Sequence, residues 1–144
     1  MVDIRQKGQS GERAVYNILN DEVDSVRRDM QLPSFAKEDR PFQRNQNQTA
    51  VGGSDLTNPF GLEIEVKNCK TLSLGAWWQQ TESSASRTGG VPILVYKVQY
   101  KGWRVRMRAN IGDEQVVADI SIDDLKSYVG RKAYSYYLDR TLIN

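Results

Sequence analysis

The six residues 62–67, Leu-Glu-Ile-Glu-Val-Lys, decide how this 144-residue chain can fold. Apolar and charged residues alternate strictly along them, which is the pattern of a β-strand with one buried and one polar face. Glu63, Glu65 and Lys67 therefore share one face of the strand. In an isolated strand such a face most often meets only solvent. Whether it does more here depends on the sequence around it.

A second acidic residue stands a few positions before this strand. Residues 52–55 read Gly-Gly-Ser-Asp, and the short connection that follows can return the chain so that Asp55 lies near Glu63 or Glu65. Two carboxylates beside Lys67 would form a cation site. Such hard oxygen ligands hold Mg²⁺, which polarises a phosphoryl oxygen and acidifies a bound water. The lysine would orient that water or balance the developing charge.

An amphipathic segment near the start of the chain adds a third acid. Apolar positions recur at three and four residues over residues 10–23, which predicts a helix with Ser10 as its N-cap. Glu12 precedes Val15 by three residues and so lies on the inward stripe, where an acid needs a partner. The alternative is a first-turn Glu favoured by the helix dipole. Arg13 lies outside the stripe and would suit a phosphate contact.

A second helix is expected over residues 75–87, closed by a Gly-Gly pair. Trp77 and Trp78 near its start are interpreted as core anchors that cover the sheet. Gln80 lies three residues after Trp77, where its amide could reach a scissile phosphate or a water on the metal. A glutamine in such a place is more often only a surface residue, and both interpretations stay open.

The rest of the chain predicts further strands and a last helix. Residues 91–98 are typical of a buried strand, residues 103–109 alternate, and Asp123-Asp124 suit the start of a helix through Tyr128. Residues 130–144 show no clear period and receive no assignment. The order α-β-β-α-β-β places helices around a mixed central β-sheet, so the expected fold class is α/β.

Composition excludes several kinds of chemistry. The chain has no histidine and a single cysteine, which removes disulfides, Cys-rich zinc sites, catalytic triads and imidazole bases. Metal-dependent phosphodiester hydrolysis by carboxylates and lysine needs neither a histidine nor a cysteine, so this composition permits it. The length predicts one domain, residues 1–144, and the longest apolar run is too short to span a bilayer. We therefore expect a cytoplasmic protein without a membrane partner.

Taken in order, these motifs resemble the PD-(D/E)xK nuclease superfamily and, within it, Holliday-junction resolvases of archaeal Hjc type and their phage-encoded relatives. The resemblance runs from Lys7 to Arg108. It rests on Lys7-Gly8 before Glu12-Arg13, on Gly53-Ser54-Asp55, on Ile64-Glu65-Val66-Lys67, on Trp77-Trp78-Gln79-Gln80, and on residues 89–97 and 102–104. Ser54 stands where the motif often has proline, and the long segment 33–48 is a second departure.

The resemblance implies a restriction-endonuclease-like fold with an αβββαβ core, a homodimer, and Mg²⁺-dependent cleavage of branched DNA, with Mn²⁺ able to substitute. No small-molecule cofactor is implied. The catalytic residues carried over are Glu12, Asp55, Glu65, Lys67 and Gln80, of which Glu12, Asp55 and Glu65 would be the metal ligands.

Candidate DNA contacts come from basic residues in several segments. Residues 103–109 carry arginines on one strand face about 7 Å apart, near the spacing of successive phosphates, although such a face is more often only solvated. Residues 33–48 are polar and contain two prolines, so we expect a loop that is mobile without its partner. The full set of candidates is Lys7, Arg13, Arg40, Arg44, Arg104, Arg106 and Arg108.

Three functions stay open at this point. The first is a homodimeric enzyme that resolves four-way DNA junctions by paired nicks, either a phage protein in the host cytoplasm or a protein of the prokaryotic cytosol. The second is a nuclease of the same fold that acts on other DNA in repair, flap processing or restriction. The third is a non-catalytic DNA-binding module. The set Asp55, Glu65 and Lys67 favours catalysis, because a binding module has no reason to place carboxylates beside phosphate.

Overall fold

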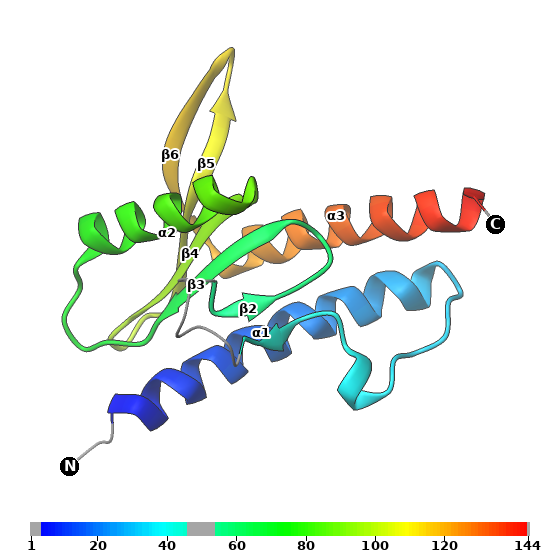
Figure 1. Cartoon of the computed structure of the whole chain (residues 1–144), viewed down its shortest axis with the longest axis horizontal. Coiled ribbons are helices and arrows are strands. Elements are labelled where there is room, and N and C mark those ends of the chain that lie inside the picture. Colours follow the sequence, from blue (N-terminus) through cyan, green and yellow to red (C-terminus); the bar gives the residue numbers. More distant parts are fainter. Residues whose placement is uncertain (1–3, 46–53, 144) are drawn as a thin grey trace.

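The computed structural model describes residues 4–45 and 54–143, which form one mixed β-sheet with helices on both faces (Figure 1). The strands are β1 (Gln43–Arg44), β2 (Leu56–Thr57), β3 (Leu62–Lys67), β4 (Val91–Val98), β5 (Gly102–Ile111) and β6 (Glu114–Ser121). They lie in the sheet in chain order. β3 and β4 are parallel, and the other neighbouring strands are antiparallel. The expected α/β class with a mixed sheet is confirmed.

The helices cover opposite faces of this sheet. Helices α1 (Ile4–Asp29) and α3 (Ile122–Ile143) pack together on one face, and α2 (Leu74–Thr88) covers the other (Figure 1). The order α1, β1, β2, β3, α2, β4 is the αβββαβ core implied by the resemblance. Because successive strand residues point to opposite faces, Val95 joins the core under α1 and α3, while Leu94 and Tyr96 pack against Trp78 of α2.

Both long helices extend further than their sequence pattern indicates. Ser10 is not an N-cap, because α1 begins six residues earlier, at Ile4. Residues 130–143, which received no assignment, continue α3. Leu125, Val129, Ala133 and Tyr137 form a buried ridge at four-residue spacing. Exposed and half-buried tyrosines around the same turns obscure that ridge in the sequence.

The middle of the chain agrees more closely with expectation. Helix α2 and strands β3, β4 and β5 lie where they were predicted, and Gly89 ends α2 in the left-handed conformation (φ 75°) that glycine tolerates best. Strand β6 was missed. In the segment 33–48, residues 46–48 lie outside the described part, and β1 together with a 3₁₀ turn (Lys37–Asp39) replaces the expected continuous loop. No helix of the described residues is long and apolar enough to cross a membrane.

Candidate active site

Two hydrogen bonds with the backbone of β3, one from the Asp55 main chain and one to its side chain, hold Asp55 against that strand. Its N–H donates to the carbonyl of Ile64 (2.9 Å), and the N–H of Val66 donates to its Oδ2 (2.7 Å). In the antiparallel pairing of β2 with β3, Leu56 stands opposite Ile64. The carboxylate of Asp55 therefore lies beside Glu65, the residue between those two partners. The short connection after Asp55 thus returns the chain as expected, whereas Gly52 and Gly53 before it lie outside the described residues.

Glu65 is a buried acid in contact with a second acid. Only 4% of the residue is exposed. Burial raises the pKa of Glu65 to about 8, with further contributions from the charge of Asp55 and from a hydrogen bond with it, while Lys67 opposes the shift. Without a cation, the two carboxyl groups therefore hold a proton between them near neutral pH. Of the two partners that the sequence left open for Asp55, the structure selects Glu65.

Glu63 has a different environment from Glu65, although both belong to β3. Its Oε1 accepts a hydrogen bond of 2.7 Å from the Thr88 hydroxyl at the end of α2. Lys67, the last residue of β3, is half-buried, and its positive charge acts on Glu65. The strand thus brings Glu65 and Lys67 to the Asp55 end of the hairpin and leaves Glu63 at the other end.

Glu12 approaches this group from α1. A Cβ at Gly11 would lie 2.9 Å from Cβ of Asn68, so glycine there allows α1 to pass close to the end of β3. Only 12% of the Glu12 side chain is exposed, and its Oε2 accepts a hydrogen bond of 2.8 Å from Arg44 Nε. Burial raises the pKa of Glu12, Arg44 opposes the shift, and the charge of Asp55 adds to it. Glu12 is in the third turn of α1, so the first-turn dipole interpretation is wrong.

The two carboxylates nearest Lys67 suit a small hard cation. Within residues 4–45 and 54–143, no three acidic or sulfur side chains are grouped closely enough to hold a metal ion. Mg²⁺ often takes only one or two carboxylates and keeps several waters, so Asp55 and Glu65 satisfy its needs. A divalent charge between them would also offset the burial and the repulsion by Asp55 that together raise the pKa of Glu65. Glu12, whose Oε2 bonds Arg44, does not form a group of three ligands with these two acids in the described part of the chain.

The other catalytic candidate, Gln80, lies on α2, the helix whose Thr88 bonds Glu63 of β3. It is exposed on α2 beside the buried Thr81, and among the described residues it makes no hydrogen bond with Asp55, Glu65 or Lys67. Trp78 is buried against the sheet and Trp77 is partly buried beside it. The expectation that this pair anchors α2 is confirmed.

Most of the arginines expected to contact DNA already have acidic partners. Arg106 bonds Asp119 of β6 through Nε (2.8 Å), which lowers the pKa of that carboxyl, and Arg108 pairs with Glu82 of α2. The strand face of β5 is therefore not the acid-free surface that its own sequence indicates. Arg104 is half-buried and forms no ion pair among the described residues. Arg13 is exposed on α1.

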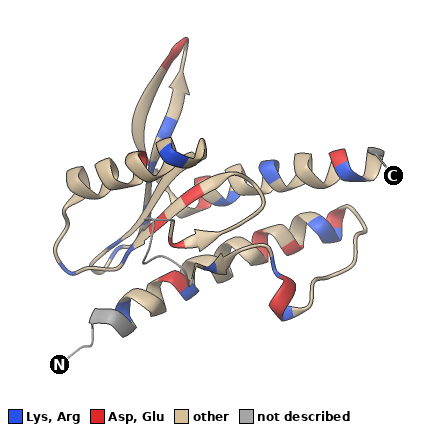
Figure 2. Ribbon diagram, in the orientation of Figure 1, with Lys and Arg blue, Asp and Glu red and all other residues tan. Residues whose placement is uncertain are grey.

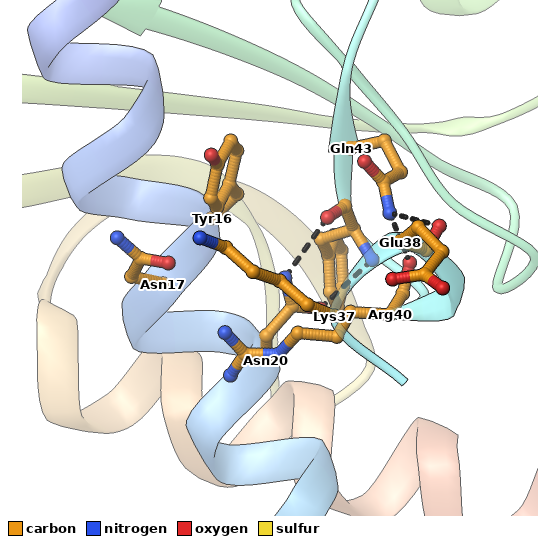
Figure 3. A pocket seen from close by; sticks show the side chains of 8 residues that line it. Tyr16, Asn17, Asn20, Lys37, Glu38, Arg40 and Gln43 are labelled. Atoms are coloured by element: carbon orange, nitrogen blue, oxygen red, sulfur yellow. Dashed lines mark hydrogen bonds between the residues drawn. The ribbon is translucent and has the colours of Figure 1, made fainter. Parts of the chain in front are cut away.

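Arg40 lines a pocket of about 310 Å³ between α1 and residues 37–43, to which β3 contributes no lining residue (Figure 3). Its Nη2 bonds Asp21 (2.7 Å) and Asp24 (3.2 Å). Figure 3 also shows Asn20 hydrogen-bonded to the backbone of the buried Phe42, which fastens this segment to α1. The arginine is thus committed to a structural contact.

The comparison with known protein families agrees with the geometry of this site. Residues 3–138 match the family described as "Phage putative PDDEXK endonuclease", a range that includes Glu12, Asp55, Glu65 and Lys67. No curated protein matches the sequence. PD-(D/E)xK nucleases generally use Mg²⁺, in keeping with the paired carboxylates. Since the match spans nearly all of the chain, from the start of α1 to the last turns of α3, the chain belongs to this family of phage PD-(D/E)xK endonucleases.

Proposed function

We propose that the protein is a Mg²⁺-dependent endodeoxyribonuclease that resolves four-way DNA junctions by paired nicks as a homodimer. The observation that carries the proposal is the contact between Asp55 and the buried Glu65, beside Lys67, in a chain of an endonuclease family. A carboxyl pair that stays partly protonated for want of a cation is a poor structural element and a suitable ligand set for a divalent metal.

Each residue has a distinct part in the proposed reaction. Asp55 and Glu65 would hold Mg²⁺, whose charge polarises the phosphoryl oxygen and acidifies a water molecule. Lys67 would orient the attacking water and balance the negative charge that develops on the phosphate. The backbone N–H of Val66 keeps Asp55 in place during the reaction. Glu12 would serve as a third acid after Arg44 turns to a DNA phosphate.

A second copy of the chain is part of the proposal, because two symmetric nicks need two active sites at a fixed separation. The β5–β6 hairpin extends away from the body of the molecule (Figure 1). Near its tip Ile111 is 67% exposed, and Val117 on the edge strand β6 is 49% exposed. These two exposed apolar side chains and the unpaired edge of β6 favour a contact between two copies, with the hairpins as the joining elements.

The test compares DNA substrates with the same protein. A labelled four-way junction is incubated with Mg²⁺ beside linear duplex, flap and single-stranded DNA, and light scattering gives the mass in solution. We expect paired nicks in the junction, little cutting of the controls, and a dimer. Equal cutting of all substrates would favour the second candidate, a nuclease for repair, flap or restriction reactions. Binding without cutting under Mg²⁺ or Mn²⁺ would indicate a non-catalytic module.

A further inference from the structure

A pocket of about 440 Å³ lies directly beyond the C-terminal end of β3. Three separate segments form it: the N-terminal part of α1, the loop after β3, and the end of β4 with the turn that follows. Its lining residues are Lys7, Asn68, Cys69, Lys70, Lys97, Gln99 and Tyr100. Three of the seven are lysines and none is acidic. Basic residues gather at this end of the sheet in Figure 2.

The pocket begins where the strand of the candidate active site ends. Lys67 is the last residue of β3, and the lining begins with Asn68. Only two residues lie between Lys67 and Lys70, and the three Cα–Cα steps that join them limit the distance between their Cα atoms to about 11 Å. The side-chain amide of Asn68 donates to the backbone carbonyl of Lys7 (3.1 Å) and so fixes α1 against the loop. A group held in the pocket would therefore lie beside the group held at Lys67.

In the part of the chain that the structure describes, the lysines of the pocket have no acidic partners. None of Lys7, Lys70 and Lys97 takes part in an ion pair among the described residues, whereas Arg40, Arg44, Arg106 and Arg108 all do. Lys97 makes only a cation–π contact, with Nζ 5.6 Å from the centre of the Trp103 ring. Three uncompensated ammonium groups around one cavity repel each other and attract an anion.

Tyr100 adds an aromatic ring at the rim of the pocket. It is 96% exposed, an unusual position for a tyrosine in a tight turn. Its φ of 67° lies in the left-handed region, which bulky residues rarely adopt and where glycine or asparagine is common. Neither the exposure nor the backbone conformation helps this turn to fold. An exposed ring beside a basic pocket is suited to stacking on a nucleobase.

We propose that this lysine pocket is a nucleotide subsite: it binds a phosphate of the DNA strand next to the one cut at Lys67, and Tyr100 stacks on an unpaired base of that strand. The proposal rests on the proposed function in that it requires DNA at the active site. It goes further in assigning a preference for DNA whose bases are unstacked near the cut, as at a branch or a single-stranded end.

The binding test uses the full chain with EDTA, so that no strand is cut. Lys70→Ala is compared with Lys101→Ala, which removes the same charge from an exposed lysine beside the pocket that does not line it. We expect Lys70→Ala to lower the dependence of log K on log salt by about 0.7–0.9, the loss of one phosphate contact, and to weaken binding to a four-way junction. An equal effect of Lys101→Ala would overturn the proposal that the pocket binds a phosphate, and would indicate that DNA is attracted by the general positive charge of this surface.

The stacking part has its own probe. Tyr100→Ala should weaken binding to a duplex with a single-stranded tail by about 5- to 150-fold and leave blunt duplex unchanged, while Tyr100→Phe retains affinity. The same loss with blunt duplex would contradict base stacking.

Alkylation of Cys69 reports directly on whether the pocket is occupied. Cys69 is the one cysteine of the sequence, is exposed, and lines the pocket. Bound DNA should slow its alkylation by a maleimide, and Lys70→Ala should reduce that protection. Unprotected Cys69 at saturating DNA would overturn the proposal. If DNA protected Cys69 but was not cleaved under Mg²⁺, the subsite would stand and the proposed nuclease function would be rejected. If DNA was cleaved but did not protect Cys69, the nuclease function would stand and the subsite would be rejected.

Discussion

Arg44 Nε lies 2.8 Å from Glu12 Oε2, and this ion pair joins β1 to the third turn of α1 at the edge of the carboxylate group. Both side chains are largely buried, with 21% and 12% exposed. The cation that neutralises Glu12 is thus part of the protein itself. In the proposed reaction, a phosphate that attracted Arg44 would release Glu12, and DNA binding would then be linked to metal binding at this site.

Arg44→Ala should destabilise the metal-free protein by about 1–3 kcal/mol, because a partly buried carboxylate loses its partner. Mg²⁺ should restore part of the loss if Glu12 can then bind it. Urea unfolding with EDTA and with Mg²⁺ measures both effects. Arg13→Ala, at the exposed next position of the same helix, is the control and should change the free energy of unfolding by less than about 0.5 kcal/mol. Equal losses in both variants would remove the special role of the pair.

Asp55→Asn and Glu65→Gln should each abolish cleavage while DNA binding is kept or tightened, because each removes a metal ligand and a negative charge that faces phosphate. Glu63→Gln is the matched control, since Glu63 lies on the same strand but bonds Thr88. Junction cleavage and gel-shift binding are measured together. Mg²⁺-dependent turnover in both site variants would show that the metal is held elsewhere.

Lys67→Ala should lower the single-turnover cleavage rate by about 10²–10³-fold, the usual loss when one group that orients water and stabilises charge is removed. Junction affinity should change little by comparison. Lys101→Ala serves again as the charge-matched control. If the rate of Lys67→Ala stayed near that of the unchanged protein, Lys67 would have only a structural role.

The raised pKa of Glu65 makes the stability of the metal-free protein dependent on pH. The pKa is about 4.5 in an unfolded chain and about 8 in the fold, so folding favours the protonated acid. Its contribution is complete below pH 4.5 and is lost as pH rises towards 8. Glu65→Gln should abolish this loss, on the order of 2–4 kcal/mol, in EDTA. Urea midpoints at pH 5 and pH 8 for both proteins measure it; parallel pH profiles would contradict the assignment.

The arginines of β5 should differ in their contribution to DNA binding. Arg104→Ala should reduce the salt dependence of log K by about one unit, since Arg104 has no acidic partner among the described residues. Arg106→Ala should change it little, because Asp119 already neutralises that side chain. Titrations across salt concentrations give both slopes. A larger effect of Arg106 than of Arg104 would mean that DNA displaces Asp119.

The parts of this molecule with a clear local period could be predicted from sequence. Strand β3 follows from the alternation of its residues, and the end of helix α2 follows from Gly89. The short connection between β2 and β3 was the reason to expect Asp55 beside an acid of β3. The partners of the arginines could not be foreseen in this way. Arg106 and Arg108 meet acids of β6 and α2, and such pairs depend on how elements pack rather than on any one segment.

The packing of α1 on α3 has a consequence for how the site is assembled. The strands of the sheet follow chain order, whereas α1, the first element of the chain, packs against α3, the last, where Gly130 lets Glu22 come close. At its other half, α1 is held by the pair of Glu12 with Arg44 and by the close approach of Gly11 to Asn68. Loss of the last turns of α3 should therefore loosen the C-terminal half of α1 while Asp55 and Glu65 stay in place, so that a distant truncation would reach the site only through the helix that carries Glu12.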